Sequence, residues 1–140
     1  MGALSATDSK RGFLLDTHTF LWSVKRPERL GEKARRIIED NDSRLYLSSI
    51  CAYETANKSR LGKLDASYES VVENYTYFAN RLGVKDLPLT LAHTYLAGSM
   101  EWEHRDPFDR FLVAQASLEN LMIITDDEQI RNHPWIDTVW

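Results

Sequence analysis

Four carboxylates stand at positions where side chains with a chemical role are commonly found. Asp16 ends the apolar run of residues 13–15, and Asp127 follows the apolar run of residues 122–124. Glu54 lies within the apolar face of a predicted helix, and Asp109 lies in the first turn of another. If the fold brings these acids together, a bound cation must offset their mutual repulsion. Hard oxygen ligands suit Mg²⁺ or Mn²⁺, and these ions commonly serve phosphate chemistry.

Each acid also has an ordinary structural explanation. Asp16 is a good N-cap for the helix that follows it, and Asp106 is a good N-cap before Pro107, which places Asp109 at the N3 position. Asp127 fits a turn after a strand. Glu54 fits least well, because a carboxylate in an apolar stripe needs a partner. That partner is either an internal arginine or a cation.

The elements that must position these acids alternate along the chain. Short apolar runs predict strands near 12–16, 45–48, 84–89 and 121–125, with a further edge strand at 138–140. Helical spacing and capping residues predict helices at 17–24, 30–40, 49–61, 67–82, 90–97 and 108–119. This alternation predicts an α/β/α sandwich around a central, mostly parallel sheet. Ligands of such sheets collect beyond the carboxyl ends of the strands, where Asp16 and Asp127 are expected.

Composition indicates one globular domain. The 140 residues, 43% of them hydrophobic, fit a single domain over 12–140, with residues 1–11 as a flexible extension or a cloning remnant. The apolar runs are too short to cross a membrane, and a single cysteine, Cys51, allows no internal disulfide. We therefore expect a cytoplasmic protein with no membrane partner, in which Cys51 is a small packed residue.

The net charge of −4 conceals a gradient along the chain. Residues 25–63 carry a net charge of +4, whereas residues 64–140 carry −8. One part could therefore face a polyanion while the other supplies metal-binding acids. The alternative is that the basic stretch from Lys25 to Arg36 is simply a solvated helix face.

Several other kinds of site are disfavoured. The four histidines show no zinc-binding spacing, and the chain has no Walker lysine, nucleophile elbow or dinucleotide-binding glycine turn.

Taken together, the motifs have a specific likeness. The segments Leu-Leu-Asp-Thr-His at 14–18, Ser-Ser-Ile-Cys-Ala-Tyr-Glu-Thr-Ala-Asn-Lys at 48–58, His-Arg-Asp-Pro-Phe-Asp-Arg at 104–110 and Ile-Thr-Asp-Asp at 124–127 occur in this order. In order and spacing the chain resembles the PIN-domain family from about residue 13 to the end. Within that family it looks like the VapC-type toxins of bacterial toxin–antitoxin pairs.

The resemblance implies a Mg²⁺- or Mn²⁺-dependent endoribonuclease that leaves a 5′-phosphate and a 3′-hydroxyl. By position, the catalytic and metal-binding acids would be Asp16, Glu54, Asp109 and Asp127. Asp106 would bind a second metal or its waters. Thr17 and Thr125 would orient the acids, and Arg110 would orient an acid or contact the phosphate.

The resemblance also implies partners. An RNA substrate, a cognate VapB-like antitoxin and a second copy of the chain in a homodimer are expected. Contacts to RNA phosphates are expected from Lys25, Arg26, Lys58, Arg60 and Lys63. The alternative function is a non-catalytic PIN-like module that binds RNA or protein. A phosphoacceptor domain fits less well, because the chain lacks an acidic pair after its first strand.

Overall fold

Five parallel strands form one sheet in the computed structural model, which describes residues 11–140. The strands are β1 (Phe13–Leu15), β2 (Leu45–Ser48), β3 (Val84–Leu87), β4 (Met122–Ile124) and β5 (Thr138–Val139). Their spatial order is β3-β2-β1-β4-β5, and every neighbouring pair is parallel. The predicted α/β architecture with a mostly parallel sheet is confirmed, including the fifth strand.

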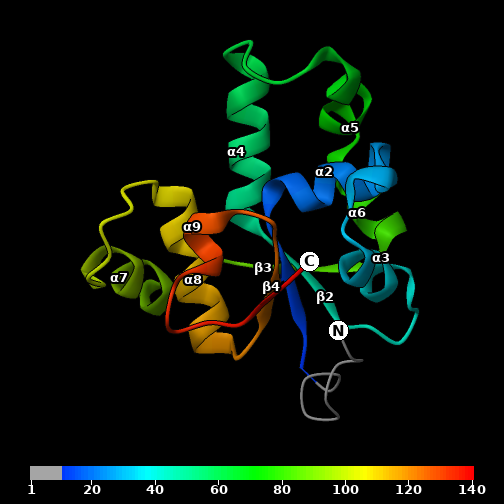
Figure 1. The fold of residues 1–140 in the computed structure, drawn as a ribbon. Coiled ribbons are helices and arrows are strands. Elements are labelled where there is room, and N and C mark those ends of the chain that lie inside the picture. The colour runs from blue at the N-terminus through cyan, green and yellow to red at the C-terminus, as the bar shows by residue number, and fades with distance from the viewer. Residues whose placement is uncertain (1–10) are drawn as a thin grey trace.

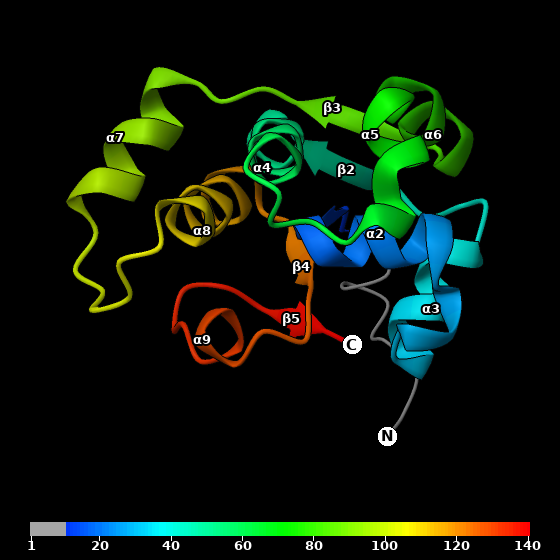
Figure 2. The same ribbon diagram turned by 90° about the horizontal axis from the view of Figure 1, so that it is seen from above.

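Helices cover both faces of this sheet (Figures 1 and 2). Helices α2 (Thr17–Lys25), α3 (Glu32–Glu39), α5 (Glu69–Glu73) and α6 (Tyr75–Leu82) lie on one side. Helices α7 (Leu91–Ser99), α8 (Pro107–Glu119) and α9 (Glu128–Arg131) lie on the other. Helix α4 (Ser49–Arg60) rises from the carboxyl end of β2 and contacts both α2 and α8. Two short 3₁₀ turns span Pro27–Arg29 and Ala66–Tyr68.

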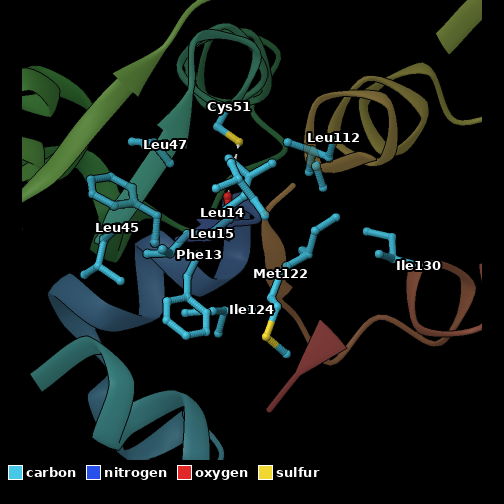
Figure 3. Packing of buried hydrophobic residues seen from close by; sticks show 14 of the residues in the cluster. Phe13, Leu14, Leu15, Leu45, Leu47, Cys51, Leu112, Met122, Ile124 and Ile130 are labelled. Carbon is cyan, nitrogen blue, oxygen red and sulfur yellow. Dashed lines mark hydrogen bonds between the residues drawn. The ribbon is translucent and has the colours of Figure 1, made fainter. Parts of the chain in front are cut away.

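The core lies between the sheet and these helices. Strands β1 and β4 are buried along their whole length, as expected for continuous apolar runs covered on both faces. Figure 3 shows Cys51 of α4 and Leu112 of α8 packed over Leu14 and its neighbours. Cys51 is 1% exposed, which confirms the expectation that it is a packed residue. Its thiol pKa is raised to about 12, mainly by burial.

The strand order creates a switch point at the centre of the sheet. From β1 the chain continues to β2 on one side, whereas from β3 it returns through α7 and α8 to β4 on the other side. Loops after β1 and β4 therefore diverge at their carboxyl ends, which is where open α/β sheets place ligands. Asp16 and Asp127 follow these two strands.

One predicted helix is wrong in its extent. The expected helix over residues 67–82 is divided into the turn Ala66–Tyr68, α5 and α6. The break is at Asn74, whose backbone leaves helical geometry (φ −127°, ψ 40°) and whose side-chain amide donates to the Ser70 carbonyl. Asparagine competes with helical hydrogen bonds in this way, and apolar periodicity alone does not reveal it.

The prediction for residues 1–11 lies largely outside the described residues, since the structure describes only Arg11 among them. Arg11 is partly buried, and its guanidinium pairs with the Asp137 carboxylate at 2.7 Å, so the ordered fold includes it. Within residues 11–140, none of the helices has both the length and the apolar character needed to span a bilayer.

Candidate active site

Asp16 occupies the junction between β1 and α2. Its Oδ1 accepts a hydrogen bond from the Thr19 amide at 2.8 Å, so it caps α2 as an ordinary N-cap would. Its Oδ2 accepts a hydrogen bond from the Thr125 hydroxyl. The residue is only 9% exposed, and burial raises its pKa despite the hydrogen bonds from Thr125 and Thr19. Because burial disfavours the charged form of Asp16, a nearby cation would stabilise its carboxylate.

Thr125 connects the ends of β1 and β4. While its hydroxyl donates to Asp16, the same oxygen accepts a hydrogen bond from the Asp127 amide at 3.0 Å. Asp127 in turn caps α9 by accepting from the Gln129 and Ile130 amides. One buried threonine therefore fixes the relative positions of both strand-end acids.

Glu54 faces inward from α4 and is 9% exposed. Its Oε1 accepts a 2.5 Å hydrogen bond from the Thr17 hydroxyl, and its Oε2 pairs with the Lys58 ammonium at 3.2 Å. The internal partner of Glu54 is thus Lys58, one turn along the helix. From the sequence, either an internal arginine or a cation was expected as this partner. Lys58 was expected to contact RNA; here it balances the charge of Glu54.

Asp109 lies in the first turn of α8 and forms a 2.6 Å pair with Nε2 of His104. Burial, followed by repulsion from Asp106 and Asp127, raises the pKa of Asp109 from 3.8 to about 6, while the hydrogen bond from His104 opposes this shift. Asp106 caps α8 through the Phe108 amide at 2.9 Å, as the sequence suggested. The mutual repulsion of these carboxylates is what a bound divalent cation would relieve.

One cluster of possible metal ligands lies at the start of α8 and just before it. His104, Asp106 and Asp109 each place a possible ligand atom within 4.8 Å of the others, and no other group of three in residues 11–140 meets this criterion. Asp16 and Asp127 are joined through Thr125, and Glu54 is joined to α2 through Thr17. The carboxylates of all these acids offer the oxygen ligands that Mg²⁺ and Mn²⁺ prefer.

Arg110, expected from the resemblance to orient an acid or contact the phosphate, is engaged by backbone carbonyls in this structure. Its guanidinium donates to one carbonyl of α7, Ala97 at 2.8 Å, and to three carbonyls of the α7–α8 connection: Met100 at 2.5 Å, Trp102 at 2.8 Å and His104 at 3.1 Å. These donors are therefore engaged by backbone carbonyls and, within residues 11–140, not by a carboxylate. It holds the loop that carries His104.

The partner of Asp109, His104, was missed because the histidines were judged only by zinc-binding spacing. The available signal was its place five residues before Asp109, ahead of a proline that begins a helix. A side chain there can fold back onto the first turn, but only the loop held by Arg110 makes it do so.

The basic residues named from the sequence lie at the C-terminal ends of α2 and α4 or just after them. Lys25 and Lys63 are exposed, and Arg60 donates to the Asn57 side chain on the same helix. Arg26 lies over the Tyr68 ring at 5.9 Å and donates to the Ser67 hydroxyl.

Comparison with known families gives a decisive result, because a model described as "PIN domain" matches residues 13–136. The chain belongs to the PIN domain family. No curated protein matches the chain. A PIN domain is thus established over nearly all the residues whose motifs carried the resemblance.

Solved structures show the same fold. VapBC2 from Rickettsia felis, bound to a DNA fragment from its promoter, matches at a TM-score of 0.68 and 15% identity, covering 91% of this chain and 98% of that one. DNA-bound VapBC from Salmonella typhimurium matches at 0.70 and 20% identity, covering 92% and 97%. FitAB bound to an IR36 DNA fragment matches at 0.55 and 18% identity, covering 91% and 93%. At these identities, the matches show that this chain shares the fold of those proteins.

Proposed function

We propose that this PIN domain is a metal-dependent endoribonuclease toxin that hydrolyses RNA phosphodiester bonds and is neutralised by a cognate antitoxin. The observation that carries the proposal is the buried hydrogen-bonded set at the switch point of the sheet. There, Thr125 fixes Asp16 and Asp127, and Thr17 fixes Glu54. A PIN fold with all these acids present and oriented favours catalysis over a purely binding role.

Asp16, Glu54, Asp109 and Asp127 are the residues that would hold Mg²⁺ or Mn²⁺, with Asp106 available for a second ion or its waters. Such an ion, when bound, polarises a phosphate and lowers the pKa of a bound water. The protein's own contribution is orientation, because the two threonine hydroxyls hold carboxylate oxygens in fixed directions before any ligand arrives. In the protein without metal, the Lys58 ammonium pairs with Glu54, and the His104 ring is hydrogen-bonded to Asp109.

RNA would reach this acidic site along the basic surface of α2 and α4. Lys25, Arg26, Lys58, Arg60 and Lys63 would neutralise backbone phosphates, so RNA affinity should fall as salt rises. The flexible stem of Lys58 also allows its ammonium to turn from Glu54 to a phosphate once the acid is engaged.

The partners follow from the same proposal. The structural neighbours are VapBC and FitAB complexes, which supports a VapB-like antitoxin for this chain. We propose a homodimer acting in the cytoplasm.

The proposal is tested by incubating the purified chain with total RNA and Mg²⁺ or Mn²⁺, with and without EDTA, and mapping the new 5′ ends. Wild-type protein should give EDTA-sensitive cuts with 5′-phosphate and 3′-hydroxyl ends, and its induction should arrest growth. Asp16→Ala and Glu54→Gln should lose both effects. RNA binding without cleavage by the wild-type protein would instead establish the non-catalytic module, and full activity of either variant would remove that acid from the site.

A further inference from the structure

An aromatic pair lies next to the proposed catalytic acids. The rings of Tyr53 and Phe108 have centroids 6.1 Å apart and are tilted by 46°. Tyr53 belongs to α4 and directly precedes Glu54, whereas Phe108 belongs to α8 and directly precedes Asp109. The pair therefore bridges the two helices that supply these acids.

Helix geometry separates the aromatic side chains from the acids by one step around each helix. Consecutive helical residues point about 100° apart. Glu54 points inward at 9% exposure, and Tyr53 points outward beside it. The pair thus stands beside the acidic site, with the Tyr53 ring on the solvent side.

The exposure of Tyr53 is not accounted for by packing. A tyrosine whose only task was to join α4 to α8 would gain from burying its ring. Tyr53 is 53% exposed although it lies between two packed helices. An exposed aromatic face beside a phosphate-handling site is the arrangement with which proteins stack unpaired bases.

We propose that Tyr53, supported by Phe108, stacks an unpaired base of the RNA next to the phosphate that is cleaved. The proposal rests on the ribonuclease function above and adds its substrate form: a single-stranded segment, because a base inside a duplex offers no free face. The charge distribution favours RNA as the occupant. Lys58 and Arg60 follow Tyr53 on the same helix and can meet the adjoining phosphates.

The chain supplies a matched control. Tyr77 of α6 is 55% exposed and contacts a phenylalanine, Phe78, with ring centroids 5.1 Å apart. It belongs to a helix that carries none of the proposed acids. Tyr77→Leu therefore removes an equally exposed tyrosine at a position where no base is expected to stack.

The test measures binding of a fluorescent, unstructured RNA octamer by anisotropy, with every variant placed in an Asp16→Ala background to prevent cleavage. Tyr53→Leu should weaken binding by about ten- to a hundredfold, the usual effect of losing one stacked base. Tyr53→Phe and Tyr77→Leu should stay within about twofold of the parent, since the first keeps the ring and the second lies elsewhere. Equal binding by Tyr53→Leu and Tyr77→Leu would overturn the proposal.

A second measurement already tests the proposal on the parent protein alone. Octamers carrying a single abasic nucleotide, tested at each position in turn, should bind weakly when the missing base is the stacked one. Tyr53→Leu should be insensitive to that same abasic site. Uniform binding by the whole abasic series would contradict stacking even if Tyr53→Leu fails to fold.

The outcomes separate this proposal from the ribonuclease function. If the wild-type chain cleaves RNA and Tyr53→Leu cleaves it with unchanged KM, the stacking proposal is wrong and the ribonuclease function stands. If the wild-type chain neither binds nor cleaves RNA, both proposals fall. Should sedimentation show that Tyr53→Leu changes the oligomeric state while RNA affinity is retained, the occupant of this surface is a second copy of the chain and the proposal is wrong.

Discussion

The Thr17 hydroxyl donates a 2.5 Å hydrogen bond to Oε1 of Glu54, joining the start of α2 to the inward face of α4. The two residues are 37 positions apart in the chain and both are buried. Glu54 is thereby oriented from one side by a neutral donor and from the other by Lys58. These two contacts hold the Glu54 carboxylate in one direction.

Thr17→Val should therefore lower Mn²⁺ affinity or RNA cleavage by about ten- to a hundredfold, the usual cost of removing a partner of a metal ligand. Thr17→Ser keeps the hydroxyl and should retain most of both. Calorimetric titration with Mn²⁺ and initial cleavage rates check the two variants. Equal values for Val and Ser at this position would show that the hydrogen bond has no part in the site.

Asp109→Asn should stabilise the metal-free protein at alkaline pH. Burial and neighbouring acids raise the folded-state pKa of Asp109 to about 6, above its unfolded value of 3.8. The protonated form thus favours folding, an advantage fully present below pH 4 and lost as pH rises through 6. At pH 8 the variant should gain on the order of 2 kcal/mol, allowing for the partial exposure of the group.

Urea unfolding in EDTA at pH 4 and pH 8 measures this difference. The gain should disappear at pH 4, where wild-type Asp109 is largely protonated in the folded protein. A gain independent of pH would assign the effect to packing and not to charge.

Lys58→Gln should tighten Mn²⁺ binding and weaken RNA binding. The lysine ammonium lies 3.2 Å from Glu54 and competes with any other cation for that carboxylate. The same substitution removes one phosphate contact, so the salt dependence of RNA binding should decrease by about one charge. Calorimetry and anisotropy over a salt series give both quantities, and Lys63→Gln is the control that lowers only the second.

Arg110→Met should destabilise the fold by at least about 2 kcal/mol, because four backbone carbonyls lose a charged donor. The loss should be seen as a lower urea midpoint in the metal-free protein. If the variant kept its stability but lost RNA cleavage, the result would support the phosphate-binding role expected for Arg110 from the sequence.

Local pattern in the sequence was enough to predict the sheet and the places of its acids. Continuous apolar runs identify strands buried on both faces, and alternation with helices makes those strands parallel. Asp16 and Asp127 follow such runs, so their location at one sheet edge could be expected. The helix break at Asn74 could not be predicted in this way, because it arises from a side-chain hydrogen bond and not from apolar periodicity.

The partners of the acids were decided by the tertiary structure. Thr125 meets Asp16 across 109 positions, Thr17 meets Glu54 across 37, and Tyr53 meets Phe108 through the packing of two helices. Such contacts depend on strand order and helix docking, which sequence spacing does not encode. The same holds for Arg110, whose charge suggested a phosphate but whose guanidinium, near the start of α8, meets four backbone carbonyls of α7 and the connection after it. The sequence by itself thus determined which acids lie at the sheet edge, and the fold determined what holds each of them there.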